Sequence, residues 1–217
     1  CEDYVGGIMG FGHSDINGLI NNCSAGSNIS GVNYIGGILG GGTFDIAECS
    51  ANGNLSASSF VGGIIVDAGN DILHCYFSGD ISNKGNYTGG ICGNTCKSIK
   101  QCVVSSAKIS GVKYIGRISG GYNETLNNFA NVKCDIKSNG YSIEVPDDEY
   151  NGYGVATDNL KSKAFYQGLS WDMEAVWDLI PGVSLPYHRY QSCPPVVLNI
   201  INSESLYVHG TCDDNGI

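Results

Sequence analysis

Apolar and polar residues follow a pattern that repeats five times along this chain. Each copy begins with an aromatic residue and a Gly-Gly-Ile sequence or a close variant of it: YVGGIMG from Tyr4, YIGGILG from Tyr34, FVGGIIV from Phe60, YTGGICG from Tyr87 and YIGRISG from Tyr114. Successive aromatic residues lie 30, 26, 27 and 27 positions apart. A period of this length is typical of solenoids, in which each repeat buries its apolar face against the next one.

Further apolar positions recur inside each copy. They are Ile20, Ile46, Ile72, Ile99 and Leu126, then Cys23, Cys49, Cys75, Cys102 and Phe129, and then Ile29, Leu55, Ile81, Ile109 and Ile136. Glycine, serine and asparagine separate these positions, so each apolar stretch is too short for a helix of ordinary length. We predict three short strands in each coil of a right-handed parallel β-solenoid, all-β with about five coils and a small mixed C-terminal cap. A four-residue insertion between Phe11 and Gly18 in the first copy is expected to form a loop.

The faces of the first strand follow from its alternation. One set of positions keeps isoleucine in every copy (Ile8, Ile38, Ile64, Ile91 and Ile118), so we expect it to point inward. The other set then forms an outward apolar stripe of Val5, Met9, Ile35, Leu39, Val61 and Ile65. Because a stripe of this size is unusual on a solvent-facing sheet, we expect the segment around Trp171 and Trp177, or a partner chain, to cover it.

The pattern changes after the repeats and predicts three regions. Residues 1–140 form the solenoid, residues 141–191 a capping segment, and residues 192–217 a hairpin that could begin a further domain. Within the capping segment, DNLKSKAFYQGL predicts a short helix with Asp158 as its N-cap and Gly168 at its end. Both tryptophans of the chain, Trp171 and Trp177, follow this helix.

Composition narrows the classes of function. The 217 residues carry a formal net charge of −10, so nucleic acid is not expected as a partner. No run of apolar residues is long enough to span a membrane, and the first 20 residues lack the pattern of a signal peptide, which suggests a mature or excised chain.

Eight of the 10 cysteines fall into three groups. Cys23, Cys49, Cys75 and Cys102 recur once per coil, which spreads their sulfur atoms along the solenoid, so we expect buried free thiols and neither a zinc site nor disulfides. For Cys92 and Cys96 a small disulfide and unpaired thiols both remain open. Cys193 and Cys212 are the best disulfide candidates, and a bridge between them is typical of an oxidising, extracellular compartment.

Catalytic and metal-binding motifs do not emerge from the sequence. The four histidines are scattered, and neither a Gly-x-Ser-x-Gly sequence nor a phosphate-binding loop is present. The acidic pairs Asp147–Asp148 and Asp213–Asp214 are interpreted as solvated loop charges, with weak calcium binding as the alternative. We therefore expect no catalytic residue, no metal ion and no cofactor.

The units YVGGIMG and YIGGILG and the segment ECSANGNLSASSFVGGI resemble the GLUG repeat. This repeat occurs in secreted and surface proteins of bacteria, among them adhesin-like proteins and non-catalytic regions of surface peptidases. The resemblance covers residues 4 to about 136, and the fifth copy departs from it at Arg117 and Phe129. Residues 169–191 resemble the Trp-rich segment that often closes such arrays. The resemblance implies a β-helix at the cell surface and no particular reaction.

From these observations we expect a non-catalytic extracellular module of a bacterial surface protein with a structural or adhesive role. Its partner is another domain of the same chain or a surface partner, either protein or glycan. One alternative is a substrate-binding or non-catalytic region of a larger secreted peptidase. A second is a β-helix enzyme acting on polysaccharides, which would need outward carboxylates clustered on neighbouring coils.

Overall fold

The chain forms two compact units, residues 1–157 and residues 158–217. The computed structural model describes residues 4–13, 18–68 and 70–191. Cys193, Cys212, the predicted hairpin and the pair Asp213–Asp214 lie outside these ranges.

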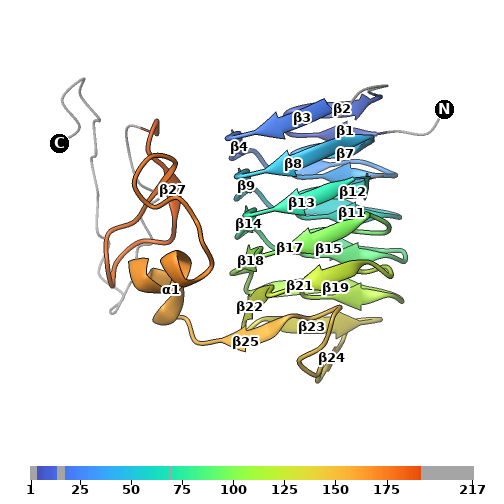
Figure 1. The fold of residues 1–217 in the computed structure, drawn as a ribbon. Coiled ribbons are helices and arrows are strands. Elements are labelled where there is room, and N and C mark those ends of the chain that lie inside the picture. Colours follow the sequence, from blue (N-terminus) through green and yellow to red (C-terminus); the bar gives the residue numbers. More distant parts are fainter. Residues whose placement is uncertain (1–3, 14–17, 69, 192–217) are drawn as a thin grey trace, which may run out of the picture. The chain divides into compact units, whose positions relative to one another are not determined.

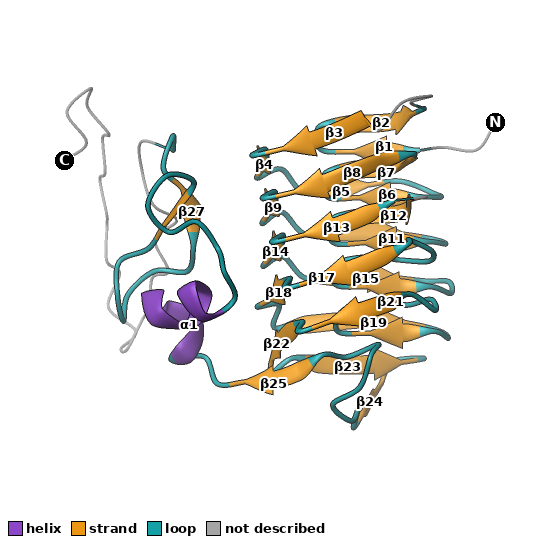
Figure 2. Ribbon diagram, in the orientation of Figure 1, coloured by secondary structure: helices purple, strands orange, loops and turns teal. Residues whose placement is uncertain are grey.

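The first unit is a parallel β-solenoid, as the repeat predicts (Figures 1 and 2). Its strands stack into five sheets, and each coil contributes one short strand to most of them. Sheet A contains β1 (Val5–Gly6), β6 (Ile35–Gly36), β11 (Val61–Gly62), β16 (Thr88–Gly89) and β20 (Ile115–Gly116). Sheet B contains β2 (Met9–Gly12), β7 (Leu39–Gly42) and β12 (Ile65–Ala68), and single bridges at Cys92 and Ser119 continue it.

The other three sheets complete each coil. Sheet C contains β3 (Gly18–Asn21), β8 (Phe44–Ala47), β13 (Asp71–Leu73), β17 (Ser98–Lys100) and β21 (Glu124–Leu126). Sheet D contains β4 (Ser24–Ala25), β9 (Ser50–Ala51), β14 (Tyr76–Phe77), β18 (Val103–Val104), β22 (Phe129–Asn131) and β25 (Tyr153–Val155). Sheet E contains β5 (Ile29–Ser30), β10 (Leu55–Ala57), β15 (Ile81–Asn83), β19 (Lys108–Gly111), β23 (Asp135–Ser138) and β24 (Tyr141–Ile143), the last of which is antiparallel to β23.

The two glycines of each repeat explain why the coil has more corners than predicted. A Cβ atom on Gly36 would lie 1.9 Å from the carbonyl oxygen of Leu39, so only glycine permits the bend between β6 and β7. A Cβ atom on Gly37 would lie 2.6 Å from the Cβ atom of Ala51 on the opposite side of the coil. The predicted first strand is therefore two strands in different sheets, joined at a corner.

This corner overturns the predicted apolar stripe. Residues on both sides of the bend enter one hydrophobic core, so the alternation of faces assumed across it does not hold. Ile35, Leu39, Val61 and Ile65 are fully buried in that core, and Val5 and Met9 of the first coil are half-buried against it. The expectation that a cap or partner covers these residues is wrong, because the core of the solenoid already contains them.

The isoleucine column is confirmed in four of its five members. Ile38, Ile64, Ile91 and Ile118 are fully buried in the same core. Ile8 belongs to the first coil, which has a neighbouring coil on one side among the described residues, and its side chain is 48% exposed.

Strand register corrects the alignment of the fifth copy. Ile99 pairs with Thr125 and Val103 pairs with Phe129, so the fifth copy is one residue shorter at this point than predicted. Asn128 therefore takes the cysteine position that we assigned to Phe129, and Thr125 takes the position assigned to Leu126. Register also supports the insertion in the first copy, because five residues separate Gly12 from Gly18 where one separates Gly42 from Phe44.

The boundary between the units lies later than predicted. Residues 141–157, which we assigned to the cap, belong to the first unit, where β25 adds a sixth strand to sheet D. The second unit contains a short 3-10 helix η1 (Asn159–Lys161), helix α1 (Lys163–Gly168) and the antiparallel pair β26 (Trp177–Asp178) and β27 (Tyr187–His188). The predicted helix is present in two parts, and Ser162 is the N-cap of α1 while Asp158 precedes η1.

The second unit packs around its own aromatic residues. Trp171 lies 4.9 Å from Tyr166 and 4.6 Å from Trp177 between ring centroids, and Trp177 stacks on His188 at 4.1 Å. The two tryptophans thus supply the core of a small unit of mixed structure.

Replacing one member of the isoleucine column tests the core. Ile64→Ala removes a fully buried side chain from a middle coil, and we expect it to lower the free energy of unfolding by about 2–5 kcal/mol. Ile8→Ala is the matched control, for which we expect a loss below about 1 kcal/mol because Ile8 is already half exposed. Urea unfolding followed by circular dichroism measures both, and equal losses would contradict the core described above.

Candidate functional site

Aromatic residues form a continuous ladder along the first unit. The rings of Tyr4, Tyr34, Phe60, Tyr87 and Tyr114 stack in order, with successive centroids 4.5, 4.8, 5.2 and 4.6 Å apart. These distances match the spacing of about 4.8 Å between neighbouring strands, because each ring comes from the same corner of its coil. The backbone at Tyr34, Tyr87 and Tyr114 is left-handed, with φ of 45°, 61° and 56°. The strained backbone at these three residues fixes the direction of their rings.

The ladder ends at a hollow. Tyr114 is the last ring, it has a ring neighbour on one face only within the described residues, and it is 57% exposed. The hollow beside it has a volume of about 550 Å³. Its aromatic and apolar lining comprises Tyr87, Tyr114, Ile115, Tyr122, Ile143 and Tyr150. This volume falls within the range of small-molecule sites.

The hollow exists because the sixth turn of the solenoid is incomplete. Sheet D has a sixth strand, β25, whereas sheet A stops at its fifth strand, β20. After β23 the chain reverses into the antiparallel strand β24 and does not enter sheet A again. The hollow therefore lies where a sixth ring would otherwise stack on Tyr114.

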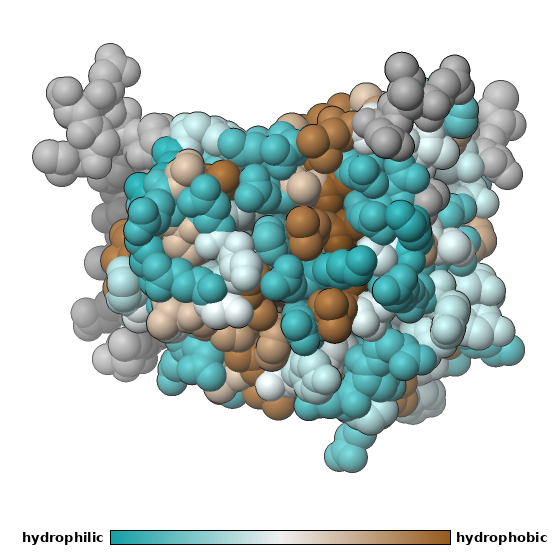
Figure 3. Space-filling view, in the orientation of Figure 1, coloured by the Kyte–Doolittle hydropathy of each residue, from teal (hydrophilic) through white to brown (hydrophobic). Residues whose placement is uncertain are grey.

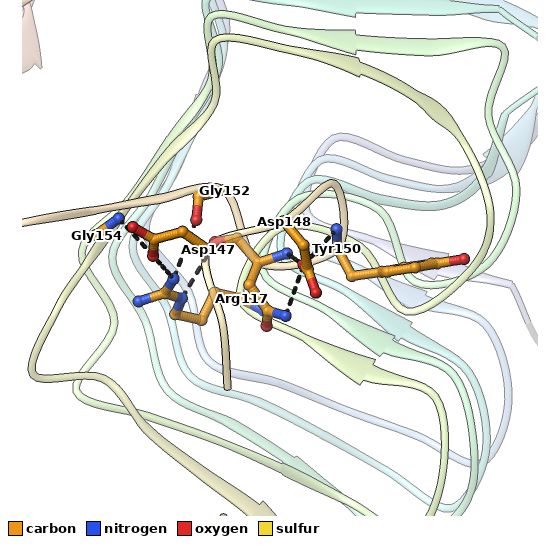
Figure 4. A network of polar contacts seen from close by, with 7 residues as sticks. Arg117, Asp147, Asp148, Tyr150, Gly152 and Gly154 are labelled. Atoms are coloured by element: carbon orange, nitrogen blue, oxygen red, sulfur yellow. Dashed lines mark hydrogen bonds and ion pairs between the residues drawn. The ribbon is translucent and has the colours of Figure 1, made fainter. Parts of the chain in front are cut away.

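Arg117 holds the loop that forms one wall of the hollow (Figure 4). Arg117 replaces the second glycine of the repeat in the fifth copy, and its side chain is 5% exposed. Its guanidinium donates to the carboxylate of Asp147 at 2.8 Å, to the carbonyl oxygen of Asn151 at 3.1 Å and to that of Gly152 at 3.0 Å. A buried guanidinium with this many acceptors fixes the backbone of residues 147–152.

Asp148 shapes the same loop. Its carboxylate accepts hydrogen bonds from the backbone amides of Tyr150 and Asn151 and from the side-chain amide of Asn151. In turn the carbonyl oxygen of Tyr150 accepts hydrogen bonds from Ile118 and Ser119, which ties the loop to the fifth coil. Asp147 and Asp148 are exposed, as predicted for solvated loop charges, and both carboxylates also order this loop. Within the described ranges no cluster of three or more His, Cys, Asp or Glu residues could hold a metal ion.

The polar groups at the hollow are few. Lys113 is exposed at its edge and is the one charged residue in the lining, and it makes no ion pair within the described part of the chain. Among the same residues the hydroxyl groups of Tyr114, Tyr122 and Tyr150 form no hydrogen bond. The side chains of Ser119 and Ser138 donate to backbone carbonyls of the solenoid, so the tyrosine hydroxyls and Lys113 supply the available polar contacts.

A smaller hollow of about 230 Å³ lies at the other end of the ladder. It is lined by Tyr4, Phe11, Gly42, Thr43 and Asp67. Burial raises the pKa of the Asp67 carboxyl, against a hydrogen bond to Asn94 that lowers it. The ladder therefore has an aromatic-lined hollow at each end.

Two outward carboxylates lie on neighbouring coils of sheet C, on a face where hydrophilic residues mix with separate hydrophobic patches (Figure 3). They are Asp45 on β8 and Asp71 on β13, and the sequence analysis did not identify them. The amide of Asp71 donates to the Asp45 carboxylate at 3.1 Å. Hydrogen bonds from Ser98 and Lys97 hold the pKa of Asp71 below its usual value, so Asp71 stays ionised near neutral pH. A general acid needs a raised pKa, so Asp71 is not suited to be the proton donor of a glycosidase.

The predicted cysteine column is present. Cys49, Cys75 and Cys102 are fully buried, Cys23 in the first coil is half-buried, and all four are free thiols. Each thiol donates to the carbonyl oxygen two residues earlier, at 3.1–3.3 Å. The residue between is left-handed in every coil, namely Asn22, Glu48, His74 and Gln101 with φ near 50°. Cysteine thus caps a corner carbonyl that turns toward the core.

Asn128 occupies the cysteine position in the fifth coil, but its side chain bonds to the backbone of the fourth coil. Its amide donates to the carbonyl oxygen of Ile99 at 2.9 Å, and its side-chain oxygen accepts the amide of Cys102 at 2.9 Å. Both bonds go to the fourth coil, so a polar residue ends the column with its side-chain oxygen and nitrogen paired.

The remaining cysteines contribute structure. Cys92 and Cys96 are buried free thiols, so of the two alternatives the unpaired thiols are found. Burial, followed by a hydrogen bond with Cys92, raises the pKa of Cys96. Cys134 is also a buried free thiol, and burial raises its pKa to about 12. A thiol with a raised pKa is a poor nucleophile, because the thiolate is the reactive form.

The hollow was not predicted from the sequence. The fifth copy departs from the repeat at Arg117, and tyrosine is frequent between Tyr114 and Tyr153, but these signals do not show where the chain leaves sheet A. Comparisons with family models, curated proteins and solved structures find no match for this chain. Within the described residues no helix has the length and apolar character needed to cross a bilayer.

Removing the Arg117 guanidinium tests its role in the wall of the hollow. We expect Arg117→Met to speed amide hydrogen exchange at Asn151, Gly152 and Gly154 by at least about tenfold, because three acceptors lose their donor. Asp147→Asn is the control, since an amide oxygen still accepts from Arg117. Unchanged exchange in Arg117→Met would mean that the loop is ordered without this side chain.

The cysteine column predicts an order of alkylation. In the native chain Cys23 should react first, because it is only half-buried, while Cys49, Cys75 and Cys102 should stay unmodified. After denaturation without reductant all four should react. Iodoacetamide labelling with peptide mass mapping measures this order, and a Cys23–Cys49 bridge in the denatured, unreduced chain would contradict it.

Proposed function

We propose that this chain is a non-catalytic extracellular module of a bacterial surface protein and that it serves as a rigid scaffold with an adhesive site. The observation that carries the proposal is the aromatic ladder ending in a hollow lined by Tyr87, Tyr114, Tyr122 and Tyr150. Tyr87 and Tyr114 are held by left-handed corners and by stacking on each other, so this part of the surface is preorganised, which favours binding because few side chains lose freedom on contact.

The chemistry of the described residues supports a binding role over a catalytic one. The carboxylates Asp45 and Asp71 are already engaged in hydrogen bonds, and the lowered pKa of Asp71 suits a fixed anion and not a proton donor. The buried thiols have raised pKa values where a shift is resolved. These groups contribute to the structure of the solenoid.

The resemblance of YVGGIMG and YIGGILG to the GLUG repeat supports the surface location. It is equally consistent with a non-catalytic region of a larger secreted peptidase. In that setting the same hollow would hold a surface partner near the peptidase, and the module itself would still bind without cleaving.

Surface labelling of native cells tests this proposal. An antibody against residues 4–157 should label intact cells of the source organism, and brief protease treatment of those cells should remove the signal. A signal that appears only after the cells are permeabilised would contradict the extracellular role.

A cell-attachment assay tests the adhesive site, and an assay for cleaved products tests the non-catalytic role. Added purified chain should compete with the attachment of native cells to their surface, and Tyr122→Ala should compete less because its exposed ring lines the hollow. Tyr141→Ala, which removes an equally exposed ring absent from the lining, is the control. Release of cleaved products from polysaccharides or proteins by the purified chain would contradict the non-catalytic role.

A further inference from the structure

We infer that the hollow at the end of the aromatic ladder binds a saccharide, with one pyranose ring stacked on the open face of Tyr114. The inference rests on the proposed binding function and names the chemical class of its ligand. It starts from the geometry of the ladder, in which flat rings follow one another at 4.5–5.2 Å from Tyr4 to Tyr114.

The ladder prepares a position for one more ring. Tyr114 stacks on Tyr87 with an interplanar angle of 17°, and its other face has no ring neighbour within the described residues. Sheet A has no sixth strand among these residues to supply such a ring, and the hollow occupies that place. A ligand ring at the same spacing would continue the stack, which favours a flat ligand with an apolar face.

The edges of the hollow favour a ring with hydroxyl groups. A pyranose ring presents C–H groups on its face and hydroxyl groups around its edge. The hydroxyls of Tyr114, Tyr122 and Tyr150 and the ammonium of Lys113 have no hydrogen-bonding or ionic partner among the described residues, so they can bond to ligand oxygens. Tyrosine is suited to such a ligand because one side chain supplies both an apolar ring and a polar hydroxyl.

The backbone at residues 119–121 offers no free amide to a peptide ligand. A peptide that adds to a sheet pairs with free amides and carbonyls along a strand edge. The amides of Ser119, Gly120 and Gly121 are already bonded, to the carbonyl oxygens of Tyr150 and Cys92 and to the hydroxyl of Ser119. Along these three residues the ligand therefore meets side chains and not free amides.

The charge of the chain argues against a nucleotide. A net charge of −10 disfavours a phosphate-bearing ligand, and Lys113 is the one cation in the lining. The volume of about 550 Å³ provides room for a saccharide of more than one ring.

Saturation-transfer difference NMR of the purified full chain tests the inference. The probes are cellotetraose, mannotetraose, chitotetraose and tetragalacturonate, each with an N-acetyl-tyrosine amide sample as the peptide-like competitor. We expect saturation of ring C–H protons in at least one saccharide, with the Kd obtained by titration. Loss of that signal on adding the tyrosine amide in modest excess, or the absence of signal from all four saccharides, would overturn the inference.

Variants locate the site. Tyr114→Ala and Tyr122→Ala should each weaken the Kd by about 2- to 10-fold, the effect of losing one aromatic contact. Tyr114→Phe should keep the stack, and Tyr141→Ala, outside the lining, should bind like the native chain. Because Tyr122 is 78% exposed, Tyr122→Ala keeps the test valid if Tyr114→Ala disturbs the fold. Equal binding by Tyr122→Ala, Tyr114→Ala and the native chain would place the saccharide elsewhere.

The outcomes separate this inference from the proposed function. If the antibody labels intact cells but the purified chain binds no saccharide, only the ligand class is overturned. Saccharide binding together with an antigen found only inside the cell would overturn the extracellular role and leave the ligand class standing.

Discussion

The in-register pairing of parallel strands between coils is the constraint on which the rest of this structure depends. Pairs such as Val61 with Ile35, Leu55 with Ile81 and Tyr76 with Val103 fix the position of every residue relative to the coil above it. Side chains from equivalent positions therefore lie about 4.8 Å apart in columns. Each side chain in a column contacts the equivalent side chain of the next coil. Residues that pack well against the same residue type therefore recur, which accounts for the separate columns of isoleucine, cysteine and aromatic rings.

The corners obey the same constraint. Left-handed residues other than glycine recur at two corners: Asn22, Glu48, His74, Gln101 and Asn127 at one, and Tyr34, Tyr87 and Tyr114 at the other. A strain of this kind persists only where the surroundings hold the backbone in place. At one corner a thiol such as that of Cys49 caps the carbonyl of Ala47, and at the other the stacked rings pack on one another. Stacking thus supplies at every corner the contacts that an isolated coil would lack.

The period of the sequence predicts the solenoid because residues one period apart occupy equivalent positions in stacked coils. The faces of the first strand could not be predicted in the same way, since the alternation rule assumes an unbroken strand and the Gly36–Gly37 bend breaks it. Assigning Phe129 to the cysteine column was wrong for a related reason. Its alignment relied on chemical likeness, whereas strand register places Asn128 at this position, where its side chain bonds to the carbonyl oxygen of Ile99 and the amide of Cys102 in the fourth coil.

The candidate site could not be predicted because it arises where the repeat stops. A complete coil buries its aromatic ring between two others, as Phe60 lies between Tyr34 and Tyr87. At the end of the array one face of the last ring, Tyr114, has no ring neighbour. Beside it lies a loop that departs from the repeat: Tyr150 of this loop lines the hollow, and Arg117 holds the loop in place. The stacking that stabilises the solenoid therefore leaves one face of Tyr114 without a ring neighbour among the described residues, and the hollow beside it follows from the same packing that forms the fold.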